Sequence, residues 1–252
     1  NPMLPEAVGA SVFPEQVIVP VREMLPQTRT HQFIMGSVAE VDSAARQLTL
    51  RTLSGEVQLR YDHLVLAIGN RARLDLMPGM AEHALPLKTV GDAMHIRNTV
   101  LRRLARIELE SDPALRRRLG HFIVVGGGFS GVEVAGELVD CLRSIQHFYP
   151  RIAPAELQVT VLHSSERLLP ELSPRLGAAA LRSLRQRGVT VRLETLAASV
   201  SAEGVTLKSG EQVAGDTVLC TIGTSANPLL RRVGAATTSG RIIVRGDLSV
   251  PG

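Results

Sequence analysis

The chain has 252 residues, of which 44% are hydrophobic and 21% are charged, a composition typical of one large or two ordinary globular domains. Lys and Arg number 28 against 24 Asp and Glu, which gives a formal net charge of +4. Aromatic residues make up only 3% and the cations are scattered among acids, whereas nucleic-acid surfaces group basic residues with stacking aromatics. No apolar run reaches the ~20 residues of a membrane helix. We therefore expect a globular protein with no nucleic-acid partner.

Cysteine and histidine usage argues against a metal centre. Cys141 and Cys220 lie far apart and form neither a CxxC motif nor a metal-ligand spacing, and the seven His include no HxH or HxxxH pair. We expect both cysteines to be reduced and to act as small hydrophobic side chains. The sequence predicts no metal site and no active-site disulfide.

The N-terminal part of the chain predicts short helices followed by strands. Prolines punctuate the first thirty residues, where a helix is expected at 17–24. A period of two over 33–41, 47–52 and 57–60 predicts an antiparallel meander of three strands. The nearly continuous apolar run 63–69 predicts a strand buried on both faces of a parallel sheet.

A connector over 73–87 leads into a pair of predicted helices. Thr89 and Asp92 have the spacing of a capping box, and apolar residues at helical spacing continue behind them to about residue 109. Asp112 and Pro113 are typical of the N-cap and first position of a second, shorter helix.

Strands and helices then alternate. Helices are expected at 130–147 and from Pro174 to just before Gly188, between strands expected at 122–125, 157–162, 189–193, 205–207 and 213–222. The last of these is interrupted by Gly215 and Asp216. A short strand at 241–244 follows. This alternation predicts an α/β fold with a Rossmann-like, doubly wound parallel sheet.

The strongest single motif is HFIVVGGGFSGVEVAGEL, residues 121–138. Four apolar residues run into a GxGxxG pattern that opens a helix. Gly126 allows the tight turn, Gly128 lets backbone N–H groups approach a pyrophosphate, and Gly131 lets the helix pack on the strand. The segment predicts a dinucleotide site at Gly126, Gly127, Gly128, Phe129, Ser130 and Gly131. The alternative is a glycine-rich strand–helix turn that binds nothing.

The residue that follows the next strand bears on which dinucleotide binds. An acid at this place accepts hydrogen bonds from the ribose of NAD, but here the residue is His163, followed by Ser164, Ser165, Glu166 and Arg167. Histidine with hydroxyls and an arginine could accommodate a 2′-phosphate, so NADH and NADPH both stay open. Alternatively, His163 caps the strand and Glu166 reaches the ribose. The segment 145–156 is interpreted as an insertion that lengthens the motif.

Several motifs together resemble one family. YDHLVLAIG at 61–69, LKTVGDA at 87–93 and GGGFSGVEVAGEL at 126–138 resemble the type II (single-subunit, non-proton-pumping) NADH:quinone oxidoreductases, within the FAD-dependent pyridine nucleotide-disulfide oxidoreductase superfamily. NPMLPE at 1–6 is similar to the family's segment that passes the flavin ring. TIG at 221–223 with NPLL at 227–230 is similar to its return hinge.

The resemblance implies a domain organisation. It implies a complete NAD(P)-binding domain at 89–224, inserted in a partial FAD-binding domain formed by 1–88, which contains the meander, and by the return segment 225–252. It also implies a fragment that lacks the N-terminal FAD glycine loop and the C-terminal region. We therefore expect this chain by itself to retain FAD poorly and to be inactive.

The resemblance further implies hydride transfer from NADH or NADPH to the flavin of FAD, and then electron transfer to a quinone. Glu133 matches a catalytic carboxylate near the nicotinamide–flavin contact; the alternative is an acid favoured by the helix dipole alone. Val38 matches a position whose backbone meets the FAD adenine, or is an ordinary residue of the meander core. Ala67 and Gly69 lie in the strand beside the FAD adenosine, and Gly223 lies at the hinge.

Other functions and partners remain open at this stage. A reductase of an iron–sulfur protein uses the same scaffold, and a regulatory protein could bind NAD(P)H without turnover. Disulfide reductases and sulfide:quinone reductases are disfavoured because they need paired cysteines. The resemblance implies a cytoplasmic protein, with peripheral contact to the cytoplasmic face of the inner membrane through the missing C-terminal region, and is compatible with a homodimer.

Overall fold

The computed structural model describes residues 2–26, 30–238 and 240–251. The chain divides into two compact units, the first formed by Asn1–Ile18 and Ala72–Gly223 and the second by Val19–Arg71 and Thr224–Gly252. The expected domain boundary after residue 88 falls inside the first unit, and the expected boundary after residue 224 coincides to within one residue with a unit boundary. The assignment of the units to FAD and NAD(P) stays a prediction.

A five-stranded parallel sheet forms the centre of the first unit, in the order β5-β12-β6-β7-β8. Its strands are β5 (Ala84–Pro86), β12 (Thr217–Cys220), β6 (His121–Val125), β7 (Gln158–Leu162) and β8 (Thr190–Arg192). The parallel sheet and the strand–helix alternation confirm the predicted α/β, Rossmann-like class. Strand β5 lies within the predicted connector, and its short length gave no periodicity from which to predict it.

The two faces of the sheet bury different partners because side chains alternate along a strand. Phe122 and Val124 of β6 point into a core shared with helices, whereas Ile123 and Val125 point into a second core. The helices of the first core include α1 (Leu4–Val8), α4 (Val90–Leu109), α5 (Pro113–Leu119), α6 (Phe129–Ile145) and α7 (Pro174–Gln186).

The second core is covered by an antiparallel sheet of order β11-β10-β9, with a short helix α3 (Met80–His83) beside it. Its strands are β9 (Ala197–Ser201), β10 (Gly204–Leu207) and β11 (Gln212–Ala214). The predicted interruption of the stretch 213–222 is confirmed, because the structure has β11 before it and β12 after it. Gly215 and Asp216 separate them, because the N–H of Gly215 turns to the carbonyl of Glu203 and that of Asp216 to the carbonyl of Arg118.

The predicted capping of α4 and α5 is confirmed. Thr89 Oγ1 accepts the N–H of Asp92 at 3.1 Å, and the Asp92 carboxylate accepts the N–H of Thr89 at 2.7 Å. Asp112 Oδ1 accepts the N–H of Ala114 at 2.9 Å. These bonds satisfy amides that have no partner within their own helix.

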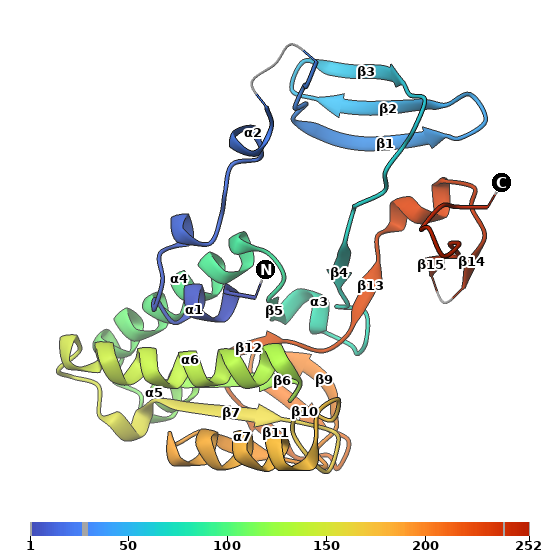
Figure 1. The fold of residues 1–252 in the computed structure, drawn as a ribbon. Coiled ribbons are helices and arrows are strands. Elements are labelled where there is room, and N and C mark those ends of the chain that lie inside the picture. Colours follow the sequence, from blue (N-terminus) through green and yellow to red (C-terminus); the bar gives the residue numbers. More distant parts are fainter. Residues whose placement is uncertain (1, 27–29, 239, 252) are drawn as a thin grey trace. The chain divides into compact units, whose positions relative to one another are not determined.

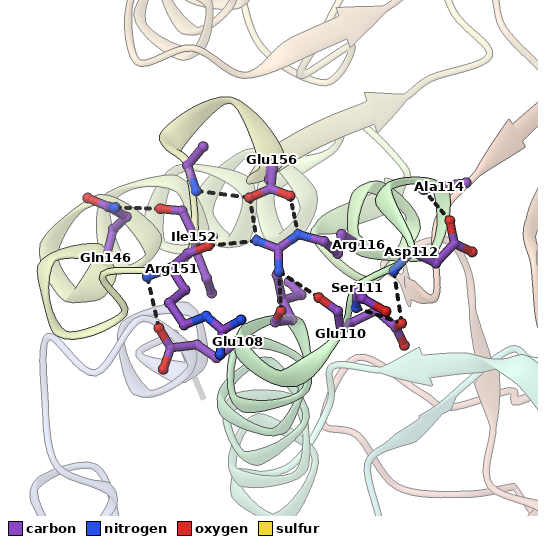
Figure 2. A network of polar contacts seen from close by, with 12 residues as sticks. Glu108, Glu110, Ser111, Asp112, Ala114, Arg116, Gln146, Arg151, Ile152 and Glu156 are labelled. Atoms are coloured by element: carbon purple, nitrogen blue, oxygen red, sulfur yellow. Dashed lines mark hydrogen bonds and ion pairs between the residues drawn. The ribbon is translucent and has the colours of Figure 1, made fainter.

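The inserted segment 145–156 forms two short 3₁₀ turns, η2 (Gln146–Phe148) and η3 (Pro154–Glu156). Figure 2 shows Arg116 of α5 at the centre of the polar network that fixes it. The Arg116 guanidinium donates to both carboxylate oxygens of Glu156 and to the carbonyl of Arg151. It also donates to the carbonyls of Ile107 and Glu110 at the end of α4.

The second unit contains the meander of order β1-β2-β3, formed by β1 (Gly36–Asp42), β2 (Gln47–Thr52) and β3 (Gly55–Arg60) (Figure 1). This confirms the predicted three strands with slightly shifted ends. A two-stranded sheet joins β4 (Asn70–Ala72) to β13 (Thr224–Ala226). The turn η4 (Pro228–Arg232) leads to a small hairpin of β14 (Thr237–Thr238) and β15 (Arg241–Ile242).

Three expectations for the second unit are wrong in extent or type. Residues 63–69 form no strand, and Val65 is 86% exposed. No described strand lies beside this run to pair with its backbone, and an apolar run alone cannot form a hydrogen-bonded ladder. The helix expected at 17–24 is reduced to α2 (Val21–Met24), since Pro20 cannot stand within a helix. Preceding it is a 3₁₀ turn η1 (Pro14–Gln16). The strand expected at 241–244 ends at Ile242.

Across the described ranges, no helix combines the length and the apolar character that crossing a membrane requires.

Candidate functional site

The glycine turn, residues 126–128, connects the end of β6 to the start of α6 at the carboxyl edge of the parallel sheet. Gly126 has φ +119°, a backbone conformation that side-chain-bearing residues avoid. A Cβ at Gly126 would lie 2.6 Å from both the Thr221 hydroxyl and the Ile222 side chain. The first glycine is therefore required by both conformation and space.

The other two glycines of the motif have different surroundings. A Cβ at Gly131 would lie 1.9 Å from the carbonyl oxygen of Gly126, so the first turn of α6 packs directly on the end of β6. A Cβ at Gly128 would meet no atom within 4 Å. The space in front of Gly128 is open to a ligand, as the predicted approach of a pyrophosphate requires.

The amides of the turn divide into two groups. The N–H of Gly126 donates to the carbonyl of Leu162 at 2.9 Å, and the N–H of Gly127 donates to His163 Nδ1 at 3.1 Å. Within the described part of the chain, the N–H groups of Gly128, Phe129 and Ser130 have no acceptor. Phe129 and Ser130 are exposed. Three unpaired amides at a helix N-terminus, beside open space, form an arrangement that binds phosphate oxygens.

His163 lies against the turn. Only 9% of its surface is exposed, and its ring carbons would lie 2.7 and 2.9 Å from a Cβ at Gly127. Its Nε2 atom is buried and makes no hydrogen bond to any residue that the structure describes. Burial lowers the pKa of His163, against smaller opposing effects of the Arg167 backbone and the Glu171 carboxylate. The ring is therefore neutral near pH 7.

Arg167, expected as a candidate for contacting a 2′-phosphate, holds its own loop. Its guanidinium donates to the carbonyl of Leu172 at 3.2 Å and to the carbonyl of Pro170 at 2.8 Å. Ser164 and Glu166 are exposed. Of the polar groups after β7, Arg167 is thus engaged in backbone contacts, whereas Ser164 and Glu166 face solvent.

Glu133 and Glu137 lie one turn apart on α6 and line a cavity of about 250 Å³ together with Glu6. Burial raises the pKa of Glu133, and the nearby Glu6 carboxylate raises it further. One carboxylate oxygen of Glu6 is buried without a hydrogen-bond partner in the described part of the chain. Glu137 accepts a hydrogen bond from the Ser11 hydroxyl, which agrees with a structural role.

The remaining predicted site residues lie elsewhere in the fold. Gly223 follows β12 with φ +66°, and its carbonyl accepts the N–H of Arg73 at 3.3 Å. In the second unit, Val38 is a half-buried residue of β1, paired with Leu50. Ala67 and Gly69 are exposed in the irregular segment after the meander. The Asn1 end of the segment expected to pass the flavin lies outside the described residues.

Residues that sequence reasoning missed also shape the turn. The Thr221 hydroxyl donates to the carbonyls of Val125 at 2.9 Å and Gly126 at 3.3 Å. The N–H of Leu169 donates to the carbonyl of Gly127 at 2.9 Å. Leu169 belongs to no motif, and Thr221 belongs to the TIG segment at 221–223, which was matched only to the return hinge. Both reach the turn from distant segments, so neither contact could be predicted from a local pattern.

Both cysteines are free thiols. Burial raises the pKa of Cys141 and of Cys220, so both stay protonated near neutral pH. Thiolate chemistry therefore has no support at either position.

The parallel sheet, the glycine turn and its unpaired amides define a Rossmann-type α/β protein whose turn fits a dinucleotide diphosphate. The comparisons agree: a family model described as "Pyridine nucleotide-disulphide oxidoreductase" matches residues 1–251. The chain belongs to the pyridine nucleotide-disulphide oxidoreductase family.

Curated relatives place the chain near one group of that family. It is 30% identical to the type II NADH:quinone oxidoreductase NdhA of Mycobacterium tuberculosis, over 97% of this chain and 55% of that protein. It is 28% identical to the mitochondrial external alternative NAD(P)H-ubiquinone oxidoreductase B2 of Arabidopsis thaliana, over 83% of this chain and 37% of that protein. The chain thus spans about half the length, or less, of the relatives it matches.

Solved structures support the fold. NDH2 of Plasmodium falciparum in complex with NADH matches with a TM-score of 0.85 at 18% identity, over 92% of this chain and 49% of that one. A ferredoxin reductase from Rhodopseudomonas palustris matches with a TM-score of 0.74 at 22% identity, over 99% and 55%. At these identities the matches establish the shared fold.

Proposed function

We propose that the complete protein is an FAD-dependent dehydrogenase that oxidises NADH or NADPH and delivers the electrons to a quinone. The observation that carries the proposal is the glycine turn, with open space at Gly128 and unpaired amides at Gly128, Phe129 and Ser130. Family membership supports the flavin, and the names of the curated relatives, which are NADH and NAD(P)H:quinone oxidoreductases, support the acceptor.

The chain's own residues have separable tasks in this proposal. The amides from Gly128 to Ser130 bind the diphosphate, with the α6 dipole adding to the attraction. Glu133, one turn into α6, orients the nicotinamide end of the dinucleotide. When bound, FAD supplies the acceptor for the hydride and the donor for the quinone.

The raised pKa of Glu133 bears on its role. Because burial and the Glu6 carboxylate both disfavour its charged form, Glu133 holds a proton to higher pH than an ordinary glutamate. A protonated carboxyl donates as well as accepts hydrogen bonds, which suits a primary amide such as the nicotinamide carboxamide. The alternative, an acid placed only to favour the helix dipole, needs the charged form.

In the second unit we propose that Val38, Ala67 and Gly69 contact the adenosine part of FAD, with Gly223 at the return to that unit. Retention of FAD by this chain alone is expected to be weak. Contact with the cytoplasmic membrane face, and a homodimer, belong to the same proposal and rest on the resemblance to the type II enzymes.

Anaerobic reduction of the bound flavin tests the function. NADH or NADPH, added to the complete yellow protein, should bleach the flavin, and a short-chain ubiquinone should restore the colour. If the flavin kept its colour with both nucleotides, the protein would not be a dehydrogenase, and non-catalytic binding of NAD(P)H would be the remaining function. Reoxidation by a ferredoxin but not by the quinone would favour the iron–sulfur alternative.

The glycine turn is tested by Gly128→Val. Because the new side chain occupies open space, the variant should fold normally and keep its flavin while its reduction by NADH slows at least tenfold. Gly91→Ala, in the exposed first turn of α4, serves as a matched control with wild-type rates. Unchanged reduction of the Gly128 variant would remove the turn from the proposed site.

A further inference from the structure

We propose that His163 is a positioning residue for the glycine turn, acting through its Nδ1 atom on Gly127, rather than a ligand of the adenosine ribose or of a 2′-phosphate. The inference rests on the proposed dinucleotide site and assigns one residue its role there. It departs from the expectation that the side chain after β7 faces the ribose.

The hydrogen bond from Gly127 to His163 sets the direction of the turn. Gly127 N–H donates to Nδ1 at 3.1 Å, while its carbonyl accepts the N–H of Leu169 at 2.9 Å. The peptide groups on both sides of Gly127 are therefore fixed by the segment that follows β7. With Gly127 held in this way, the next three amides have no acceptor in the described part of the chain, and a Cβ at Gly128 would meet no atom within 4 Å.

His163 is itself held by backbone bonds on both sides. Its N–H donates to the carbonyl of Arg192 at 2.9 Å, and its carbonyl accepts the N–H of Thr195 at 2.8 Å. The ring lies flush on Gly127, where a Cβ would come within 2.7 Å of it. A side chain this closely packed and only 9% exposed is positioned to support the turn, and its Nε2 atom is buried away from a ribose.

The tautomer follows from the same contact. Because Nδ1 accepts a hydrogen bond, the proton of the neutral ring is on Nε2. Protonation of Nδ1 would turn the acceptor into a second donor that faces the Gly127 N–H. The turn should therefore lose its support when the imidazole becomes charged, and dinucleotide affinity should fall as the pH falls through the pKa of His163.

Other charged groups near the ring must be separated from this effect. The segments that pack on the ring carry carboxylates and guanidinium groups at Glu166, Arg167, Glu171, Arg192 and Glu194. A variant that changes only the imidazole keeps all of them. Asn is that variant, because its Oδ1 can take the place of Nδ1 as an acceptor and does not titrate.

The experiment measures binding of NAD⁺ and of NADP⁺ to the complete protein by calorimetry, with no turnover. It is run at pH 8 and at stepwise lower pH, until the NMR shifts of the His163 ring show that it is charged. His163→Leu keeps the apolar contact but removes the acceptor. It should weaken the affinity for each dinucleotide that wild type binds at least tenfold, and by the same factor if wild type binds both. His163→Asn should stay within about threefold of wild type at pH 8. A change in the ratio of NAD⁺ to NADP⁺ affinity in His163→Leu would instead assign His163 to the ribose or its phosphate and overturn the inference.

The pH comparison decides the matter if His163→Leu does not fold. Wild type should bind more weakly once His163 is charged than at pH 8, and His163→Asn should show a clearly smaller loss over the same pH range. Equal losses in the two proteins would overturn the inference. Failure of wild type to bind either nucleotide would overturn the proposed function and this inference with it, whereas wild-type affinity in a folded His163→Leu would overturn the inference alone.

Discussion

At the residue scale, three positions of one motif are glycine for three different physical reasons. Gly126 has a positive φ, Gly131 sits against the carbonyl of Gly126, and Gly128 borders open space. The sequence motif treats them alike, since it records only the absence of a side chain. In the structure, the backbone conformation and the packing of α6 on β6 require glycine at 126 and 131, whereas only a ligand would require it at 128.

Gly131→Ala tests this separation against Gly128→Ala. A Cβ at Gly131 would be 1.9 Å from a backbone oxygen, which no side-chain movement can relieve, so α6 must shift from β6. We expect Gly131→Ala to lower the free energy of unfolding by about 2–4 kcal/mol, in the range of overpacking and strain. Gly128→Ala should change it by less than ~1 kcal/mol. Denaturant titrations followed by circular dichroism would compare them, and equal losses would contradict the geometry.

At the scale of helices and strands, one side chain, Arg116, connects several elements. The Arg116–Glu156 pair is only 14% and 19% exposed, and the guanidinium also binds carbonyls at the end of α4 and in the inserted segment (Figure 2). The hydrogen bond from Arg116 holds the pKa of Glu156 below its ordinary value and is the largest of the causes. Arg116 thereby connects the insertion to both α4 and α5, and Glu108 of α4 adds a bond to the N–H of Arg151.

Arg116→Leu should destabilise the protein by about 2–3 kcal/mol, because it removes the ion-pair partner of Glu156 and one donor from each of three carbonyls. Arg117→Ala, on the same helix but exposed, should cost less than ~0.5 kcal/mol. Chemical denaturation at pH 7 compares the two variants. Similar losses would show that the Arg116 network contributes nothing beyond a surface charge.

The same pair predicts a pH dependence. A depressed carboxyl pKa contributes stability that is present above the unfolded-state value, ~4.3, and is lost as the pH falls through the lower folded-state value. Wild type should therefore lose stability on acidification below about pH 4.5 more steeply than Arg116→Leu does. Thermal melts at a series of pH values would measure the two slopes, and parallel curves would contradict the assignment.

At the scale of the whole molecule, the N-terminal segment up to Ile18 belongs to the first compact unit. Helix α1 buries Leu4, Ala7 and Val8 in the core that α4 and α6 share. The sequence places residues 1–88 together in one domain, but no local pattern records which core a five-residue helix joins. The first unit is therefore completed by a segment that precedes it by more than fifty residues.

Leu4→Ala tests this packing. Leu4 is 5% exposed, and emptying such a site costs about 2–5 kcal/mol. We expect hydrogen exchange in the parallel sheet of the first unit to speed up, while the meander of the second unit keeps its protection. Leu109→Ala, at a side chain 84% exposed at the end of α4, should leave both unchanged. Faster exchange confined to the meander would contradict the packing.

Local signals sufficed for much of this protein. The capping box of α4, the Asp112 N-cap of α5, the apolar strands and the GxGxxG turn give α4, α5, β6 and α6 their type and nearly their ends. The hydrogen bonds and side-chain periods involved lie within a few residues. The same motif predicts where the strand turns into the helix, whereas the structure shows which amides of that turn are paired. For these features the sequence alone was enough.

Tertiary structure decided whatever depends on partners distant along the chain. The run 63–69 has the composition of a buried strand but no described neighbour to pair with, and β5 becomes a strand only because β12 lies beside it. The clearest case is His163, whose residue type suggested a contact with the cofactor and whose Nδ1 atom accepts the N–H of Gly127. A sequence records that an imidazole follows a strand, but only the packing of Leu168, Arg192 and Thr195 around it determines the direction in which the ring faces.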